Sequence, residues 1–157
     1  MAEHARILVV DDDESIRKTL VTILEEKGYV VDTAKNGKEA IERSKTRFYN
    51  LLLIDIRLPD MEGTKLLTTL KETTPRMIKI IMTGYPSLQN AIEAVNKDAD
   101  AYMLKPLNMN EVLYTIREHL KRQEQAKKYS EEKVAEFIKT RVRELDEEKN
   151  MALAKTR

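Results

Sequence analysis

Five short apolar runs alternate with amphipathic segments between residues 6 and 120 of this chain. The runs are Arg6–Val10, Tyr29–Ala34, Asn50–Asp55, Met77–Met82 and Ala101–Leu104. After each run, apolar residues recur at spacings of three and four, which is typical of a helix with one buried face. Strands that alternate with helices favour βαβ crossovers. The sequence therefore predicts an α/β fold, with a five-stranded parallel sheet covered by helices on both faces.

The third run ends in a carboxylate. Leu51–Ile54 is wholly apolar, which is typical of a strand buried on both faces, and Asp55 follows it directly. A buried carboxylate is costly unless it is paired or bound to a metal. The next residues, from Arg57 to Gly63, include Pro and Gly and are typical of an open loop. Asp55 is therefore expected at the carboxyl end of a central strand, facing a crevice.

Other chemically distinctive residues follow the remaining strands at equivalent positions. Asp11 and Asp12 come after the first run, Thr83 after the fourth and Lys105 after the fifth. Each alone is better explained as a solvated loop residue. Ligands of open α/β sheets, however, bind outside the carboxyl ends of the strands. The shared position of these residues predicts a single site.

The residue types at this site favour phosphoryl chemistry. Three neighbouring carboxylates repel one another, and Mg²⁺ with its oxygen ligands relieves that repulsion. Lys105 would add a positive charge and Thr83 a hydroxyl donor. A carboxylate nucleophile would then form an acyl phosphate, which water cleaves and which suits a transient signal.

Composition limits the other classes of function. The net charge of +1 gives no reason to expect contact with nucleic acid. The absence of Cys excludes disulfides, a thiol nucleophile and Cys-ligated metal. No apolar run reaches membrane-spanning length and the N-terminus lacks a signal-peptide pattern, so we expect a soluble, cytoplasmic protein without membrane contact.

Four motifs together resemble the CheY-like receiver domain of two-component response regulators. They are Ile7–Asp12, Asp55–Gly63, Met82–Gly84 and Ala101–Pro106. Each motif alone is weak, but their joint pattern is specific, and the resemblance covers residues 5 to about 122. It implies a flavodoxin-like sheet in the order 2-1-3-4-5 with five helices. We accordingly predict a receiver domain over residues 1–122.

The resemblance also implies a metal site and a phosphoacceptor. Asp55 would accept the phosphoryl group. Asp12 and Asp55 would ligate Mg²⁺ directly, with the backbone carbonyl of Arg57 as a third protein ligand. Asp11 would act on the metal largely through water.

By the same resemblance, Thr83 and Lys105 would hold the phosphoryl group, and Tyr102 would be a switch aromatic that follows Thr83. An ordinary core role for Tyr102 remains open. The Lys105–Pro106 peptide bond is expected to be cis.

The family implies a signalling protein that assists its own phosphorylation and dephosphorylation, rather than an enzyme with a separate substrate. The phosphodonor would be a sensor histidine kinase. A downstream protein or output domain would bind the face formed by the fourth helix, fifth strand and fifth helix.

Four positions carry narrower predictions. Arg57 and Tyr85 lie two residues beyond Asp55 and Thr83, and their bulk predicts a shielded, slowly hydrolysed phosphoryl group. Asp13 is expected to cap the first helix rather than to bind metal. Asp98 stands where many receivers carry Gly, at a position that often needs left-handed backbone geometry.

Two rival functions involve the acidic run that begins at Asp11. Its D-x-D spacing is similar to that of haloacid dehalogenase-type phosphatases, in which Asp11 would be the nucleophile and Asp55 incidental. A calcium-binding EF-hand loop fails on spacing, because Ile16 and Thr22 replace the required Gly and Glu.

Residues 123–157 differ in composition, with many Lys, Arg and Glu and no Gly or Pro. Their apolar residues fall on one side of a helix, and they are Val134, Phe137, Ile138, Val142 and Leu145. This amphipathic extension is expected to continue the fifth helix or to break near Tyr129–Ser130, and no heptad pattern persists. It could pack lightly on the domain, connect to a further domain of a longer protein, or form a homodimer.

Overall fold

The computed structural model describes residues 4–155, in which five strands and five helices alternate. The strands are β1 (Arg6–Val10), β2 (Val30–Ala34), β3 (Leu51–Asp55), β4 (Ile78–Thr83) and β5 (Ala101–Leu104). The helices are α1 (Glu14–Glu26), α2 (Gly37–Thr46), α3 (Gly63–Thr69), α4 (Leu88–Asn96) and α5 (Met109–Lys155). The ends of the two predicted domains, residues 1–3 and 156–157, lie outside the described residues.

The strands form one parallel sheet in the order β2-β1-β3-β4-β5, which confirms the predicted fold class. β3 lies at the centre, and all five of its residues are buried. Its register pairs Ile54 with Val10 of β1 and Asp55 with Met82 of β4. The carboxyl ends of these three strands therefore meet at one edge of the sheet.

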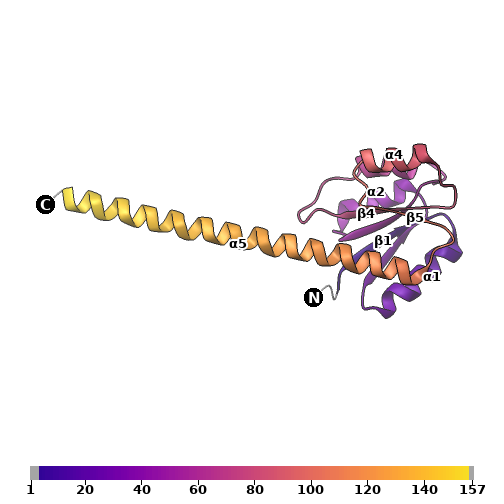
Figure 1. Ribbon diagram of the computed structural model, residues 1–157, viewed down its shortest axis with the longest axis horizontal. Helices are drawn as coiled ribbons and strands as arrows, with labels where there is room; N and C mark the ends of the chain where they lie inside the picture. Colours follow the sequence, from indigo (N-terminus) through magenta and orange to yellow (C-terminus); the bar gives the residue numbers. More distant parts are fainter. Residues whose placement is uncertain (1–3, 156–157) are drawn as a thin grey trace. The chain divides into compact units, whose positions relative to one another are not determined.

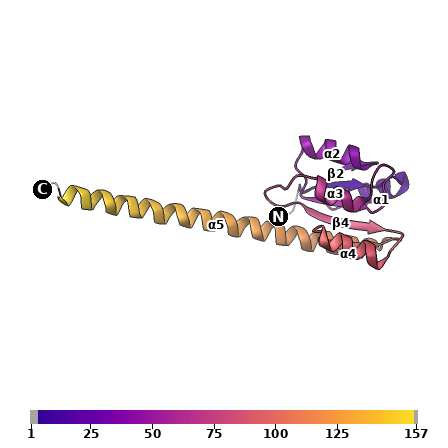
Figure 2. The same ribbon diagram turned by 90° about the horizontal axis from the view of Figure 1, so that it is seen from above.

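Alternate residues of a strand belong to two separate hydrophobic cores, one on each face of the sheet. Leu8 and Val10 face one core, whereas Ile7 and Val9 face the other, as the period of two in a strand requires. The first core contains residues of α2, α3 and α4, and the second contains residues of α1 and α5. Figure 1 shows α2 and α4 on one side of the sheet and α1 on the other, and Figure 2 gives the perpendicular view.

Helix ends follow local chemistry, with one departure from the sequence expectation. Asp13 caps α1 by accepting hydrogen bonds from two backbone N–H groups, as predicted. The spacing of Leu66, Leu67 and Leu70 predicts a third helix that ends near Thr74–Pro75, but α3 ends at Thr69. The hydroxyls of Thr68 and Thr69 both donate to the carbonyl oxygen of Lys65, and such local bonds weaken the last turn of a helix.

A polar cluster at the amino end of the sheet joins α5 to the strands. The amide of Gln123 donates to the carbonyl oxygens of Asn50, at 3.0 Å, and Arg76, at 2.9 Å. Its own Oε1 accepts from Nδ2 of Asn50, at 3.0 Å. Asn50 Oδ1 in turn accepts from the backbone N–H of Arg6, the first residue of β1. Nothing in the sequence pattern singled out Gln123.

Residues from Glu124 onward form a second compact unit. α5 runs without a break past Tyr129–Ser130, so the continuous helix is the correct alternative of the two. Every residue from Glu124 to Lys155 is exposed. Among residues 4–155, no helix combines the length and apolar character needed to cross a membrane.

Candidate phosphoacceptor and metal site

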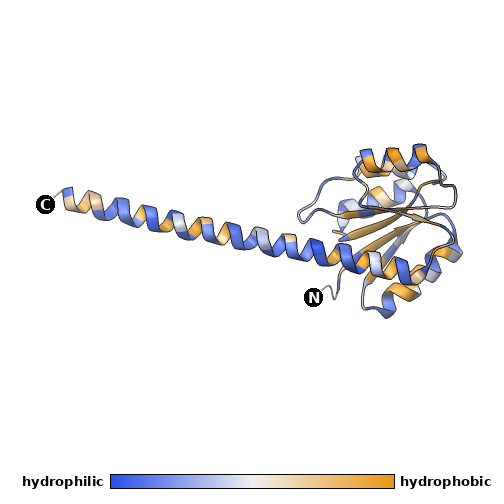
Figure 3. Cartoon of the chain, in the orientation of Figure 1, coloured by the Kyte–Doolittle hydropathy of each residue, from blue (hydrophilic) through white to orange (hydrophobic). Residues whose placement is uncertain are grey.

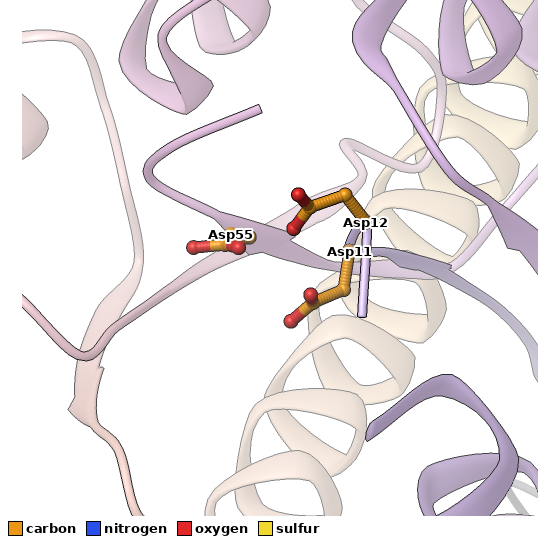
Figure 4. A group of neighbouring side chains, drawn as sticks. All are labelled: Asp11, Asp12 and Asp55. Atoms are coloured by element: carbon orange, nitrogen blue, oxygen red, sulfur yellow. The ribbon is translucent and has the colours of Figure 1, made fainter. Parts of the chain in front are cut away.

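Three carboxylates converge at the carboxyl edge of the sheet. Single ligand oxygens of Asp11, Asp12 and Asp55 all lie within 4.8 Å of one another. Asp11 and Asp55 are buried, whereas Asp12 is exposed. Figure 4 shows the carboxylates of Asp11 and Asp12 directed to the side on which Asp55 lies. Hard oxygen ligands at this spacing, with one open to solvent, fit Mg²⁺ that keeps part of its water shell.

Lys105 supplies the positive charge at the site. Its Nζ lies 2.7 Å from Asp11 Oδ2 and 3.4 Å from Asp55 Oδ2. Burial opposes the charge of Lys105, but its hydrogen bond and ion pair with Asp11 and the charge of Asp55 together raise its pKa. Sequence position predicted that Lys105 lies at this edge of the sheet, but it did not indicate the direct ion pair with Asp11.

Asp55 is held in an environment that disfavours its charge. Burial raises the pKa of its carboxyl, and the neighbouring charge of Asp11 raises it further. Lys105 and the backbone N–H of Arg57, which donates to Oδ1 at 3.3 Å, oppose that rise. A divalent cation would add positive charge and favour the ionised, nucleophilic carboxylate.

The loop after β3 packs tightly against the backbone of Asp55. The N–H of Gly63 donates to the carbonyl oxygen of Ile56 at 2.7 Å. A Cβ at Gly63 would lie 2.2 Å from the carbonyl oxygen of Asp55. Only glycine therefore allows α3 to begin this close to the phosphoacceptor candidate, which gives a physical reason for the Gly at the end of the Asp55–Gly63 motif.

Thr83 and Tyr102 lie in the two strands at one side of the sheet, β4 and β5. Thr83 is fully buried at the end of β4, and its hydroxyl oxygen accepts the backbone N–H of Tyr85 at 2.9 Å. Tyr102 in β5 packs against the core that α2, α3 and α4 line. Its hydroxyl is buried and has no hydrogen-bond partner within residues 4–155. The Lys105–Pro106 bond is cis and Asp98 has a φ of 65°, as expected.

Arg57 and Tyr85 contact each other. The guanidinium carbon of Arg57 lies 4.2 Å from the centroid of the Tyr85 ring, a cation–π contact. This contact joins the loop after β3 to the loop after β4. Sequence position indicated that both side chains flank the site, but it could not show that they stack.

The family model for the response regulator receiver domain matches residues 7–117, which is more than half of the chain. The chain belongs to the response regulator receiver family. The transcriptional regulatory protein ZraR of Klebsiella oxytoca is 38% identical over 118 residues, which are 75% of this chain and 27% of that protein. The chain thus spans about a quarter of the length of this relative.

Solved structures agree with this receiver assignment. A CheY-like receiver domain protein from Methanospirillum hungatei JF-1 is 44% identical, with a TM-score of 0.75, and the match covers 79% of this chain and 99% of that one. A response regulator from Burkholderia pseudomallei, solved with a phosphorylated aspartic acid, a calcium ion and citrate, is 33% identical with a TM-score of 0.65, covering 69% and 64%. The comparisons give the phosphatase alternative no support.

Proposed function

We propose that this receiver is a switch in which Asp55 accepts a phosphoryl group from a sensor histidine kinase. The observation that carries this proposal is the buried Asp55 carboxylate, 3.4 Å from Lys105 and inside the three-carboxylate cluster. The phosphorylated aspartic acid in the Burkholderia pseudomallei structure supports the same chemistry. Cytoplasmic localisation, where such a kinase would deliver the group, stays a prediction.

The residues have distinct roles in the transfer. A carboxylate oxygen of Asp55 forms a bond to phosphorus as the bond between phosphorus and the kinase imidazole breaks, and the imidazole nitrogen keeps the electron pair. Asp12 and Asp55, with the Arg57 carbonyl, would hold Mg²⁺, and Asp11 would act on it through water. When bound, the ion neutralises phosphoryl oxygens. Lys105 would exchange part of its contact with Asp11 for a phosphoryl oxygen.

Phosphorylation would change a surface through Thr83 and Tyr102. The Thr83 hydroxyl moves to the phosphoryl group, and Tyr102 repacks in the space that Thr83 leaves. The buried hydroxyl of Tyr102 has no hydrogen-bond partner among residues 4–155, so its present position gives up no hydrogen bond when the ring repacks. Phosphorylation then shifts a pre-existing equilibrium.

The face formed by α4, β5 and α5 is suited to read this change. It exposes apolar side chains that a partner would cover, and they are Leu88, Ile92, Val95, Leu104 and Tyr114. Large exposed apolar patches mark interaction sites on soluble domains. A downstream protein or output domain is the expected occupant.

The test uses Mg²⁺ and acetyl phosphate, with intact mass as the readout. The wild type should gain one phosphoryl group, which peptide mapping should place on Asp55, and Asp55→Asn should gain none. Asp146→Asn in the extension is the matched control and should be labelled like the wild type. An adduct on Asp11 that persists in Asp55→Asn would instead support the phosphatase alternative.

A further inference from the structure

Asp60 joins the loop after β3 to the start of α2. Its Oδ1 accepts the backbone N–H of Gly37 and its Oδ2 accepts that of Lys38, both at 2.9 Å. The first N–H groups of a helix have no acceptor within the helix itself. Here the two carboxylate oxygens of Asp60 supply acceptors from 23 and 22 positions further along the chain. The contact therefore fixes the loop to α2, as well as completing the first turn of the helix.

This anchor is additional to an ordinary helix cap. Asn36 is the N-cap residue of α2, and its Oδ1 accepts the backbone N–H of Glu39 at 2.8 Å. A negative charge at a helix N-terminus is stabilised by the helix dipole. Burial opposes the charge of Asp60, but the hydrogen bonds from Gly37 and Lys38 lower its pKa. The carboxylate is therefore ionised at neutral pH, and both of its oxygens can accept.

Met61 adds an apolar contact beside this polar one. A Cβ at Gly37 would clash with the sulfur of Met61, so the lack of a side chain at Gly37 lets the loop approach α2 this closely. Met61 also packs against the hydrophobic core that contains Val10 and Ile54. Figure 3 shows the hydrophobic strands at the centre of the receiver domain. The loop is thus held both by the start of α2 and by the core.

The anchored loop also carries Arg57. Arg57 pairs with Glu62 in an antiparallel bridge. Inside this bridge, the N–H of Leu58 donates to the carbonyl oxygen of Met61 at 3.2 Å. Asp60 lies within the turn that these contacts close, so a shift of its backbone is passed on to Arg57. The carbonyl of Arg57 is the third protein ligand in the proposed magnesium site.

We propose that Asp60 is a positioning residue for the metal site, because its bonds to α2 hold the loop from which the Arg57 carbonyl would bind Mg²⁺. A carbonyl ligand has no side chain that packing could lock, so its position depends on how the backbone is held. Groups that orient a metal ligand contribute about 10–100-fold to metal affinity. We expect about tenfold for Asp60, because the carboxylate ligands Asp12 and Asp55 lie outside this loop. This inference rests on the proposed function, which supplies the metal ligands.

Titration of the full chain with Mn²⁺ tests the inference, with the electron paramagnetic resonance signal of the free ion as the readout. Mn²⁺ binds the same carboxylate and carbonyl oxygens as Mg²⁺, and the titration needs no phosphodonor. Asp60→Ala should bind the ion about tenfold more weakly than the wild type. Asp60→Asn loses the same charge but keeps one acceptor oxygen, so its loss should be smaller, about threefold.

Two control variants separate positioning from charge and from helix stability. Glu62→Gln removes a carboxylate from the same loop, and the exposed Glu62 side chain makes no capping hydrogen bond. Its affinity for Mn²⁺ should stay within about twofold of the wild type, because an exposed charge is screened by salt. Asn36→Ala removes the cap of α2, so it should lower the melting temperature as Asp60→Ala does but leave the affinity for Mn²⁺ unchanged.

The Mg²⁺ dependence of phosphorylation by acetyl phosphate gives a second readout. In Asp60→Ala the half-saturating Mg²⁺ concentration should rise about tenfold, whereas the rate at saturating Mg²⁺ should stay close to that of the wild type. A loss of rate at every Mg²⁺ concentration would show a merely structural role and contradict the inference. Wild-type Mn²⁺ affinity in Asp60→Ala, or an equal loss in either control variant, would overturn the inference and leave Asp55 as the phosphoacceptor. A wild type that binds no Mn²⁺ would instead overturn the proposed metal site, and the inference with it.

Discussion

At the amino end of the sheet, the amide of Gln123 makes three hydrogen bonds with neutral partners. At the carboxyl end, by contrast, the ionisable side chains of Asp11, Asp55 and Lys105 lie in one cluster. The amino-end cluster has little reason to change, because its neutral groups already have partners. The carboxyl-end cluster carries two mutually repelling carboxylates for one ammonium. Of these two clusters, the one at the carboxyl end therefore favours added positive charge.

One buried and one half-buried lysine show the same contrast. Lys79, near the amino end of β4, donates to the carbonyl oxygen of Leu67 at 2.9 Å, and burial lowers its pKa. Lys105 is half-buried, and although burial opposes its charge, the carboxylates of Asp11 and Asp55 raise its pKa. The same side chain is thus a structural donor at one end of the sheet and a charge-balancing group at the other.

The largest expected effect is at the carboxyl end. Lys105→Gln should lower the initial rate of phosphorylation by acetyl phosphate about 100-fold, because a positioned donor to the phosphoryl oxygens is lost. Intact mass against time measures the rate, and Lys38→Gln on the surface is the control. A wild-type rate in Lys105→Gln would contradict a role for Lys105 in phosphoryl transfer at the carboxyl end.

At the amino end the expected effect is on stability. Gln123→Leu should lower the free energy of unfolding by about 2 kcal/mol, because it leaves the Asn50 amide and the Arg76 carbonyl without this partner. Urea unfolding measures the change, and Gln125→Leu, exposed on the same helix, should cost little. If Gln123→Leu kept wild-type stability but changed the rate of phosphorylation, the contrast between a structural amino end and a chemically active carboxyl end would be wrong.

Asp55→Asn, in contrast, should raise the free energy of unfolding of the metal-free protein. Because the native pKa of Asp55 is raised, its ionisation on going to neutral pH costs stability, which Asn avoids. We expect a melting temperature about 2–5 °C above that of the wild type at pH 7 in EDTA. The difference should shrink as pH falls through the native pKa of Asp55, where the wild-type carboxyl becomes neutral. A constant difference from pH 7 to pH 3 would refute this electrostatic origin.

The smallest expected effect concerns the Arg57–Tyr85 contact. Tyr85→Ala should shorten the lifetime of the phosphorylated protein about threefold, since a cation–π contact of about 0.5–1 kcal/mol no longer holds the two loops over the site. Loss of the adduct mass after removal of the phosphodonor gives the lifetime. Tyr114→Ala removes a ring 5.7 Å from Arg117 outside the site and should leave the lifetime unchanged. A wild-type lifetime of seconds would contradict the shielding itself.

Much of the receiver was predictable because its signals are local. A period of two or of three to four in the apolar residues defines strands and helices, and the carboxyl ends of parallel strands share one edge of the sheet. Asp11, Asp12, Asp55 and Lys105 could therefore be placed at one edge of the sheet from strand positions alone, and the structure brings their side chains together there. That Thr83 acts with them stays a prediction. The end of α3 was missed because Leu70 is apolar and buried without being helical.

The sequence by itself determined the fold class, the edge of the sheet that carries the chemistry and the residue types found there. Only the tertiary structure decided which charges pair, that Lys105 contacts Asp11 more closely than Asp55, and that Gln123 joins α5 to the strands across 73 positions of sequence. The physical reason is that these interactions act over different distances along the chain. Periodicity and turn chemistry act over a few residues, whereas a buried hydrogen bond or a shifted pKa depends on atoms that chain folding brings together from distant positions.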